Sequence, residues 1–145
     1  MPQKFSILLA DDDSDDQEFF TAALSGLMIN GIEAKRLVEV HAVYNGVEAL
    51  DYLLCRNNYE KRKSDFPDFI VLDLNMPVMD GFTVLQEIQA HQELKTIPVY
   101  ILTTSRDENQ KKKCLTLGCA GFFSKPPKVS ELQKVIEMMI SGQVK

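Results

Sequence analysis

Charged and polar residues stand directly after several short apolar runs of this sequence. Asp11 and Asp12 follow one run, Asp73 ends a second, and Thr103 and Lys125 follow two more. A carboxylate at the mouth of a buried strand is costly to keep ionised unless something pairs with it. Three carboxylates brought together would repel one another, and some would have to protonate. A divalent cation and one lysine carry three positive charges that would balance the cluster, and oxygen ligands of this kind suit Mg²⁺.

A carboxylate beside Mg²⁺, a lysine and a threonine could accept a phosphoryl group. The metal and Lys125 would neutralise the transferring oxygens, and Asp73 would be the in-line nucleophile. Thr103 could then donate a hydrogen bond to the new phosphoryl oxygens. The alternative is a structural role, in which Asp73 only caps the turn that follows it.

The stretch 69–81 holds the central carboxylate. Residues 69–72 form a short apolar run, and after Asp73 come Asn, Pro, Asp and Gly, the residues of tight turns. A run this short, bounded by turn residues, is typical of a strand buried on both faces. Asp80 is expected to shape the turn before Gly81.

Apolar runs alternate with segments of helical periodicity along the chain. Ser14 is expected to be the N-cap of the first helix, with Gln17 in the capping-box position. Asp15 and Asp16 are expected to stabilise its first turn, and Asn30-Gly31 marks a loop. The predicted strands cover residues 5–10, 37–43, 69–73, 99–102 and 121–124, and the predicted helices begin at Ser14, about Val47, Gly81, Ser105 and about Ser130.

The helix that Ser105 opens is expected to be weakly held. Ser105 and Glu108 form a capping box, but residues 109–113 offer almost no apolar face before Cys114. A helix with little surface to bury is free to move, as a switching element needs.

Strands that alternate with helices in this way predict an α/β fold with a parallel sheet. We expect the flavodoxin-like, doubly wound (βα)5 arrangement, a five-stranded parallel sheet with strands in the order 2-1-3-4-5. That order places the switch point between the first and third strands, where ligands bind at the carboxyl ends. Asp11, Asp12 and Asp73 would therefore converge there, with Thr103 and Lys125 at the same edge.

Length and composition fit one soluble domain. The chain has 145 residues, so residues 1–145 are expected to form a single domain, with a core of about 5–140 and no output domain. A net charge of −5 argues against nucleic acid as a partner. The three cysteines form no C-x-x-C pair, which suits a reducing compartment. The sequence contains neither a signal peptide nor a membrane-spanning stretch, so we expect a cytoplasmic protein without a membrane partner.

The sequence resembles the receiver domain of two-component response regulators across essentially its whole length. The matching segments are 9–13 (LADDD), 72–81 (LDLNMPVMDG), 101–104 (ILTT) and 124–126 (SKP). The resemblance implies that Asp73 is phosphorylated from a phosphohistidine on a sensor histidine kinase or phosphotransfer protein. It implies Mg²⁺ as cofactor, bound directly by Asp12, Asp73 and the backbone carbonyl of Asn75, with Asp11 helping through water.

The same resemblance assigns the remaining site residues. Thr103 and Lys125 would contact the phosphoryl group, and the peptide bond between Lys125 and Pro126 would be cis. Asp13 falls at a position that the family leaves variable, so it is not counted as a ligand. Neither histidine, His41 nor His91, is given a role.

Two features distinguish this chain within the family. Many members have tyrosine where this chain has Phe122, the aromatic residue expected to move with the switch threonine. The long polar segment 56–67 and the lack of an output domain resemble the stand-alone receivers that serve phytochrome-like sensor kinases. Such a protein would signal through contacts with a downstream protein, and a homodimer is left open. The basic residues 61–63 are expected to be solvated.

Two other functions stay open at this point. An aspartate-nucleophile phosphohydrolase has a related sheet and similar residues, but it carries a second aspartate where this chain has Asn75. A receiver-like binding module would act without phosphate, although the intact set of acids, Thr103 and Lys125 argues against it. We therefore expect no enzymatic activity beyond phosphorylation and dephosphorylation of the protein's own aspartate.

Overall fold

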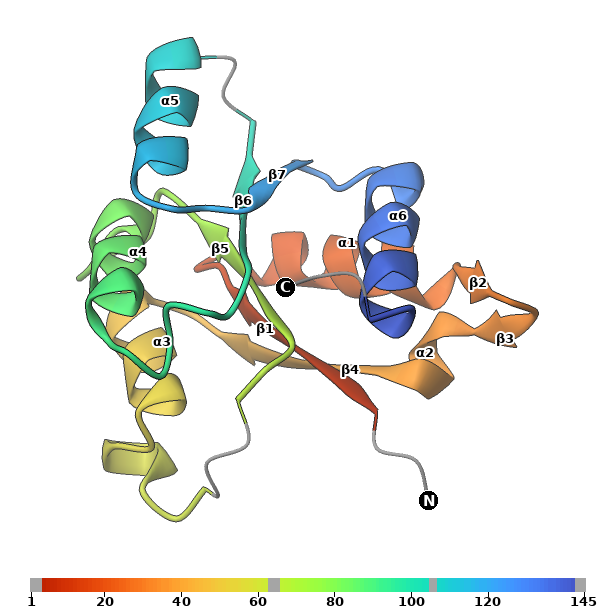
Figure 1. Ribbon diagram of the computed structural model, residues 1–145, viewed down its shortest axis with the longest axis horizontal. Coiled ribbons are helices and arrows are strands. Elements are labelled where there is room, and N and C mark those ends of the chain that lie inside the picture. Colours follow the sequence, from red (N-terminus) through yellow and green to blue (C-terminus); the bar gives the residue numbers. More distant parts are fainter. Residues whose placement is uncertain (1–3, 63–65, 105–106, 143–145) are drawn as a thin grey trace.

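The computed structural model describes residues 4–62, 66–104 and 107–142 of the chain. A parallel sheet lies at its centre, with strands in the order β4-β1-β5-β6-β7 (Figure 1). This arrangement confirms the predicted flavodoxin-like fold with strand order 2-1-3-4-5. The five strands are β1 (Phe5–Ala10), β4 (Val38–Val43), β5 (Phe69–Asp73), β6 (Val99–Thr103) and β7 (Gly121–Ser124).

Helices cover both faces of this sheet, as Figure 1 shows. Successive residues of a strand point to opposite faces. In β1, Ile7 and Leu9 pack into one apolar cluster with α1 and α6, whereas Leu8 and Ala10 pack into another with α3 and α4. The helices of these two layers are α1 (Ser14–Ser25), α6 (Val129–Ile140), α3 (Gly46–Leu53) and α4 (Gly81–Ala90).

Helix α1 begins at Ser14, so Ser14 is not its N-cap. The cap is Asp13, whose Oδ1 accepts hydrogen bonds from the N–H groups of Asp15 at 2.8 Å and Asp16 at 3.4 Å. A carboxylate that reaches two free N–H groups is a stronger acceptor than a hydroxyl. The prediction of a capping box made by Ser14 and Gln17 is therefore wrong.

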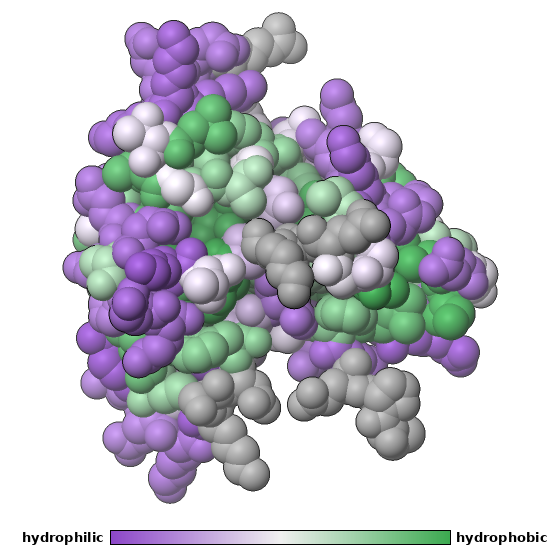
Figure 2. All heavy atoms as spheres, viewed as in Figure 1, coloured by the Kyte–Doolittle hydropathy of each residue, from purple (hydrophilic) through white to green (hydrophobic). Residues whose placement is uncertain are grey.

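Helix α5 (Glu108–Thr116) buries a single residue of its span, Cys114. Figure 1 shows it projecting beyond the sheet, and in Figure 2 the same region is strongly hydrophilic. Its N-cap is Asp107, whose Oδ1 accepts from the N–H of Asn109 at 2.9 Å. The predicted capping box of Ser105 and Glu108 is wrong, because the helix begins at Glu108 and Asp107 is its N-cap. Ser105 itself lies outside the described residues.

A β-hairpin that the sequence analysis did not predict precedes β4. It consists of β2 (Met28–Ile29) and β3 (Ile32–Glu33), and the short helix α2 (Ala34–Leu37) follows it. Asn30 has φ 52° and Gly31 has φ 80°, the positive values that a two-residue type I′ turn requires. The loop predicted at Asn30-Gly31 is the two-residue turn of this hairpin, while the short strands on either side of it were not predicted.

Contacts between aromatic rings hold the connection after α3 against β4 and α3. It contains the short 3₁₀ helix η1 (Asn57–Tyr59). The ring of His41 stacks on Tyr52 with centroids 4.3 Å apart, and Tyr59 meets His41 edge-on at 5.6 Å. The guanidinium of Arg62 lies 4.0 Å over the Tyr52 ring and donates to the Tyr52 carbonyl at 2.7 Å. The prediction that residues 61–63 are solvated is therefore wrong for Arg62, and residue 63 lies outside the described residues.

Candidate functional site

The acidic residues meet because β1 and β5 are neighbours that end at the same edge of the sheet. Ala10 stands opposite Leu72 in this strand pair. The residues that follow them, Asp11 and Asp73, therefore leave adjacent strands at the same level. Asp11, Asp12 and Asp73 each offer a carboxylate oxygen, and these atoms all lie within 4.8 Å of one another. The structure thus brings together the three acids that the sequence placed at the switch point.

A buried amide holds the backbone at Asp11. The Nε2 atom of Gln17 donates to the carbonyl of Asp11 at 2.8 Å and to the carbonyl of Val43 at 2.9 Å. The Asp11 side chain is fully buried, and its Oδ1 accepts from the N–H of Asp13 at 3.0 Å. These contacts fix the direction of the Asp11 carboxylate.

The acidic trio has the chemistry of a divalent cation site. Asp11 and Asp73 are buried, while Asp12 is exposed. Asp11 Oδ2 is buried and, among the described residues, it is held by the ion pair with the Lys125 ammonium rather than by a hydrogen bond. Asn75, the fourth predicted ligand, donates its N–H to Asp73 Oδ1 at 3.3 Å. Hard oxygen atoms and excess negative charge fit a magnesium-type ion.

Lys125 reaches this cluster from the end of β7. Its Nζ lies 3.2 Å from Asp11 Oδ2 and 3.2 Å from Asp73 Oδ2. A third carboxylate is closer, because Asp16 Oδ2 in α1 lies 2.8 Å from the same nitrogen. The Lys125–Pro126 peptide bond is cis, as the resemblance implied. One ammonium group therefore faces three carboxylates.

Asp16 is a site residue that the sequence analysis missed. That analysis gives it only a structural role in the first turn of α1. In the structure it lines one cavity with Asp73 and Lys125, and Phe19 from the next turn of the helix lines it too. A signal was present: a helix that begins directly after β1 must place its first turn at the edge of the sheet that carries the site.

Burial and charge repulsion shift the protonation of the site residues. Burial raises the pKa of Asp11 from 3.8 to about 6; the charge of Asp73 adds to this, while the hydrogen bond from Asp13 and the charge of Lys125 oppose it. Burial also raises the pKa of Asp73, against the pull of Lys125. Burial alone would lower the pKa of Lys125, but its carboxylate partners outweigh that effect and raise it. The site therefore carries more negative charge than its lysine can balance.

Thr103 lines two cavities, one together with Asp73 and the other together with Phe122. A cavity of about 270 Å³ is lined by Thr103 together with Asp73, and a second cavity of about 390 Å³ is lined by Thr103 together with Phe122. The Phe122 ring is partly buried, and Lys111 Nζ lies 5.7 Å from its centre. Thr103 thus stands where a change at Asp73 can reach Phe122.

The turn after β5 keeps Asp73 and α4 close together. Asp80 is the N-cap of α4, and its Oδ1 accepts from the N–H of Thr83 at 2.9 Å, in keeping with its predicted place at this turn. The N–H of Gly81 donates to the carbonyl of Leu74 at 2.9 Å. A Cβ atom on Gly81 would overlap the carbonyl oxygen of Asp73, so only glycine fits here.

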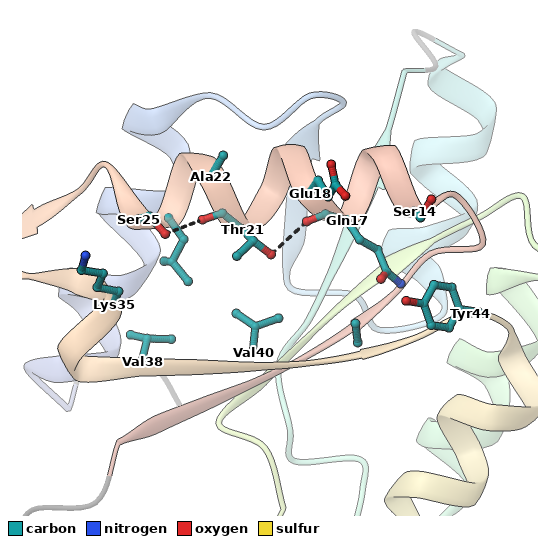
Figure 3. Close-up of a pocket in the computed structure, with 12 residues that line it drawn as sticks. Ser14, Gln17, Glu18, Thr21, Ala22, Ser25, Lys35, Val38, Val40 and Tyr44 are labelled. Carbon is teal, nitrogen blue, oxygen red and sulfur yellow. Dashed lines mark hydrogen bonds between the residues drawn. The ribbon is translucent and has the colours of Figure 1, made fainter.

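A larger groove of about 570 Å³ lies elsewhere, between α1 and β4 (Figure 3). Val38 and Val40 line it from the strand. Thr21 and Ser25 line it from the helix, and their hydroxyls donate to the helix's own carbonyls at 2.9 Å and 3.0 Å. None of the predicted site residues lines this groove, so it is separate from the acidic cluster.

The sequence profile of the response regulator receiver domain matches residues 7–137. The chain belongs to this family. The response regulator Rcp1 of Synechocystis sp. is 34% identical over 99 residues, which are 68% of this chain and 66% of Rcp1. A longer relative is the sensor histidine kinase CheAY of Helicobacter pylori, 27% identical, of which this chain spans 15%. Another is the hybrid signal transduction histidine kinase G of Dictyostelium discoideum, 30% identical, of which this chain spans 4%.

Solved receiver structures have the same fold. The bacteriophytochrome response regulator AtBRR superposes with a TM-score of 0.79 at 34% identity, covering 94% of this chain and 92% of AtBRR. The phosphorylated cyanobacterial phytochrome response regulator RcpA gives 0.76 at 29% identity, with 99% and 96% covered. A Mn²⁺-bound form of Rcp1 gives 0.73 at 30% identity, with 97% and 95% covered. The predicted family is thus confirmed, while the roles of individual site residues stay predictions.

Proposed function

We propose that this receiver domain accepts a phosphoryl group on Asp73 and transmits a signal through protein contacts. The observation that carries the proposal is the setting of the Asp73 carboxylate. Its side chain is 5% exposed, lies in the acidic trio, and has Oδ2 3.2 Å from Lys125 Nζ. A carboxylate held between a metal-type cluster and a lysine is the arrangement that phosphoryl transfer needs.

The phosphoryl donor we propose is a phosphohistidine on a sensor histidine kinase or phosphotransfer protein. In the transfer, the bond between phosphorus and the donor imidazole breaks, and a bond forms between phosphorus and an oxygen of Asp73. The imidazole leaves with the electron pair and takes up a proton. Asp73 must be ionised to attack, and although burial raises its pKa, the charge of Lys125 favours the ionised form.

Asp12, Asp73 and the backbone carbonyl of Asn75 are proposed to bind Mg²⁺ directly, and Asp11 is proposed to help through water. When bound, the ion would neutralise charge on the transferring oxygens. Support comes from the trio's carboxylate oxygens, all within 4.8 Å of one another, and from the Mn²⁺-bound form of the related Rcp1.

Thr103, Lys125 and Phe122 are proposed to read the phosphorylated state. New phosphoryl oxygens would accept hydrogen bonds from the Thr103 hydroxyl and the Lys125 ammonium. A shift of Thr103 would open volume toward Phe122, and the cavity that both residues line supports this connection. The weakly buried α5 would then move with the ring and change the surface offered to partners.

The partners we propose are a phytochrome-like sensor kinase and a downstream protein. Support comes from the described roles of AtBRR and RcpA as phytochrome response regulators, and from the sensor kinases among the relatives. The net charge of −5 favours protein over nucleic acid as the target.

No helix in the described part of the chain is long and apolar enough to cross a membrane. The cysteines are free thiols, which supports the reducing cytoplasm as its compartment.

The deciding experiment is incubation of the purified protein with Mg²⁺ and a small phosphodonor. We expect an acid-stable, base-labile adduct on the peptide that contains Asp73, and its absence in Asp73→Asn. Asp15→Asn is the matched control, because Asp15 is an exposed acid in the first turn of α1. Both variants should keep the circular dichroism of the folded domain.

Other outcomes would overturn the proposal. Steady turnover of organic phosphates would indicate a phosphohydrolase, although that activity lacks its second aspartate because Asn75 occupies the position. An intact protein that forms no adduct would indicate a phosphate-independent binding module. Stable phosphate on the Asp73 peptide of Asp73→Asn would place the acceptor elsewhere.

A further inference from the structure

We propose that Asp16 is a positioning residue for Lys125 that restrains the reaction of Asp73 with phosphoryl donors. The inference rests on the proposed function of Asp73. It starts from the ion pair between Asp16 Oδ2 and Lys125 Nζ, which at 2.8 Å is shorter than either pair that Lys125 makes with Asp11 and Asp73, both 3.2 Å.

The ammonium group has three N–H donors, and three carboxylates surround it. Lys125 is therefore fully engaged before any phosphoryl group arrives. A phosphoryl group on Asp73 brings new anionic oxygens to the same place. Lys125 can reach them only by loosening one of its present contacts.

Asp16 differs from the other two partners in where it comes from and in how exposed it is. Asp11 and Asp73 leave the ends of strands and are 0% and 5% exposed in their side chains. Asp16 belongs to the first turn of α1 and is 22% exposed, while Lys125 is 16% exposed. The N–H of Asp16 is held by the N-cap Asp13, so its carboxylate approaches Lys125 from a fixed point on the helix.

Asp16 also lies outside the candidate metal cluster. The three acids whose oxygens lie within 4.8 Å of one another are Asp11, Asp12 and Asp73. Asp16 shares a cavity with Asp73, Thr103 and Lys125, the residues proposed to contact the phosphoryl group. Its charge therefore acts on the lysine side of the site.

Two physical effects of this charge point in the same direction. The carboxylate repels an approaching anionic donor across the cavity, and it neutralises part of the Lys125 charge that would attract that donor. Both effects slow phosphorylation. Removal of the charge should leave Lys125 free to meet the phosphoryl group, while the metal ligands stay in place.

The test compares Asp16→Asn, Asp16→Glu and the neighbouring control Asp15→Asn in the full chain with saturating Mg²⁺. Acetyl phosphate serves as an anionic donor. We expect Asp16→Asn to raise the rate constant of phosphorylation about three- to tenfold, the range of one partly screened charge. Asp16→Glu should stay near the wild-type rate because it keeps the charge, and Asp15→Asn should do the same because Asp15 is exposed to solvent.

A second readout separates positioning from a structural effect. The Mg²⁺ affinity of Asp16→Asn, followed by the metal-dependent rise in melting temperature, should stay within about threefold of wild type because no proposed ligand is lost. The rate advantage of Asp16→Asn should shrink at high salt, where charge interactions are screened. If the Asp16→Asn variant does not fold, Asp16→Ser takes its place in the same measurements.

Each result supports or overturns the inference. A rate for Asp16→Asn equal to or below that of Asp15→Asn overturns it, as does a rate advantage that Asp16→Glu shares. If wild type itself takes up no phosphoryl group, the proposed function is wrong, and the inference that rests on it is overturned as well. If wild type reacts and Asp16→Asn is unchanged, only the role of Asp16 is wrong.

Discussion

The buried carboxylate of Asp11 faces the ammonium of Lys125, with Oδ2 3.2 Å from Nζ. The pair does not make Asp11 easy to ionise, because burial raises its pKa to about 6. Burial and the charge of Asp73 therefore raise the pKa of Asp11, while the charge of Lys125 lowers it.

The first prediction is that the metal-free protein loses stability as the pH rises from about 4 to about 7. The unfolded chain releases the Asp11 proton near 3.8, while the folded chain keeps it until about 6, so the native state binds more protons across this window. One such group lowers the free energy of unfolding by up to about 3 kcal/mol over this pH range. Urea unfolding at several pH values measures it.

The control for this pH effect is Asp11→Asn, which cannot titrate at this position. Its stability should fall less over the same window. Saturating Mg²⁺ should also reduce the loss in wild type, because a bound cation favours ionised ligands. Equal pH slopes for wild type and Asp11→Asn would contradict the prediction.

A second prediction concerns the metal. Mg²⁺ should bind in the millimolar or sub-millimolar range and raise the melting temperature by linkage. Removing the carboxylates of Asp12 and Asp73 together, as asparagines, should erase this shift. A shift that survives in the double variant would place the ion elsewhere, and a shift lost in the control Asp15→Asn would point to a general effect of surface charge.

A third prediction follows from the close approach of Gly81 to Asp73. Gly81→Ala should destabilise the domain by about 1–3 kcal/mol or more, because its Cβ would overlap the Asp73 carbonyl oxygen. It should also slow phosphorylation, since the acceptor strand must shift. The control is Gly26→Ala, where the nearest atom is 3.7 Å away and φ is −81°, so the change should be neutral or slightly stabilising. Equal losses in the two variants would refute the argument.

The fourth prediction concerns Phe122, which lacks the hydroxyl that many family members have at this position. A phenylalanine ring can pack inward without leaving a donor unsatisfied. We therefore expect the inward state to be populated before phosphorylation, so that phosphate shifts an existing equilibrium. NMR relaxation of the Mg²⁺-bound, unphosphorylated protein should show exchange at Phe122 and in α5.

Two variants test this equilibrium. Phe122→Tyr should reduce the exchange, because its inward ring would need a partner for the hydroxyl. Thr103→Ala should keep the exchange but lose most of the response to phosphorylation. A single rigid outward ring of Phe122 in wild type would contradict the prediction. A full structural response to phosphorylation in Thr103→Ala would contradict it too.

Sequence and structure agree on the strands and on where their polar ends meet. The short apolar runs predict buried strands, and the parallel arrangement forces their carboxyl ends onto one edge. For this reason Asp11, Asp73 and Lys125 could be expected together before any contact was known. Their mutual distances came only from the folded chain.

Local signals were present for the hairpin that the sequence analysis missed and for the two helix caps that it misplaced. Asn30-Gly31 between apolar residues is a strong hairpin signal, and the structure forms that hairpin. Asp13 and Asp107 were available as caps beside the serines that were predicted instead. Neighbouring residues of similar capping preference compete, and backbone geometry decides between them.

By itself, the sequence determined the family, through the motifs by which it resembles receiver domains. It also determined which acids stand at the strand ends, because these depend on local apolar patterns and on the general rules of parallel sheets. Only the tertiary structure decided which carboxylate lies nearest to Lys125. Asp16 is 109 positions before that lysine in the chain, and the two meet because α1 starts at the edge where β7 ends. Periodicity along one segment carries no information about such a contact, since it depends on the packing of two elements that are distant in sequence.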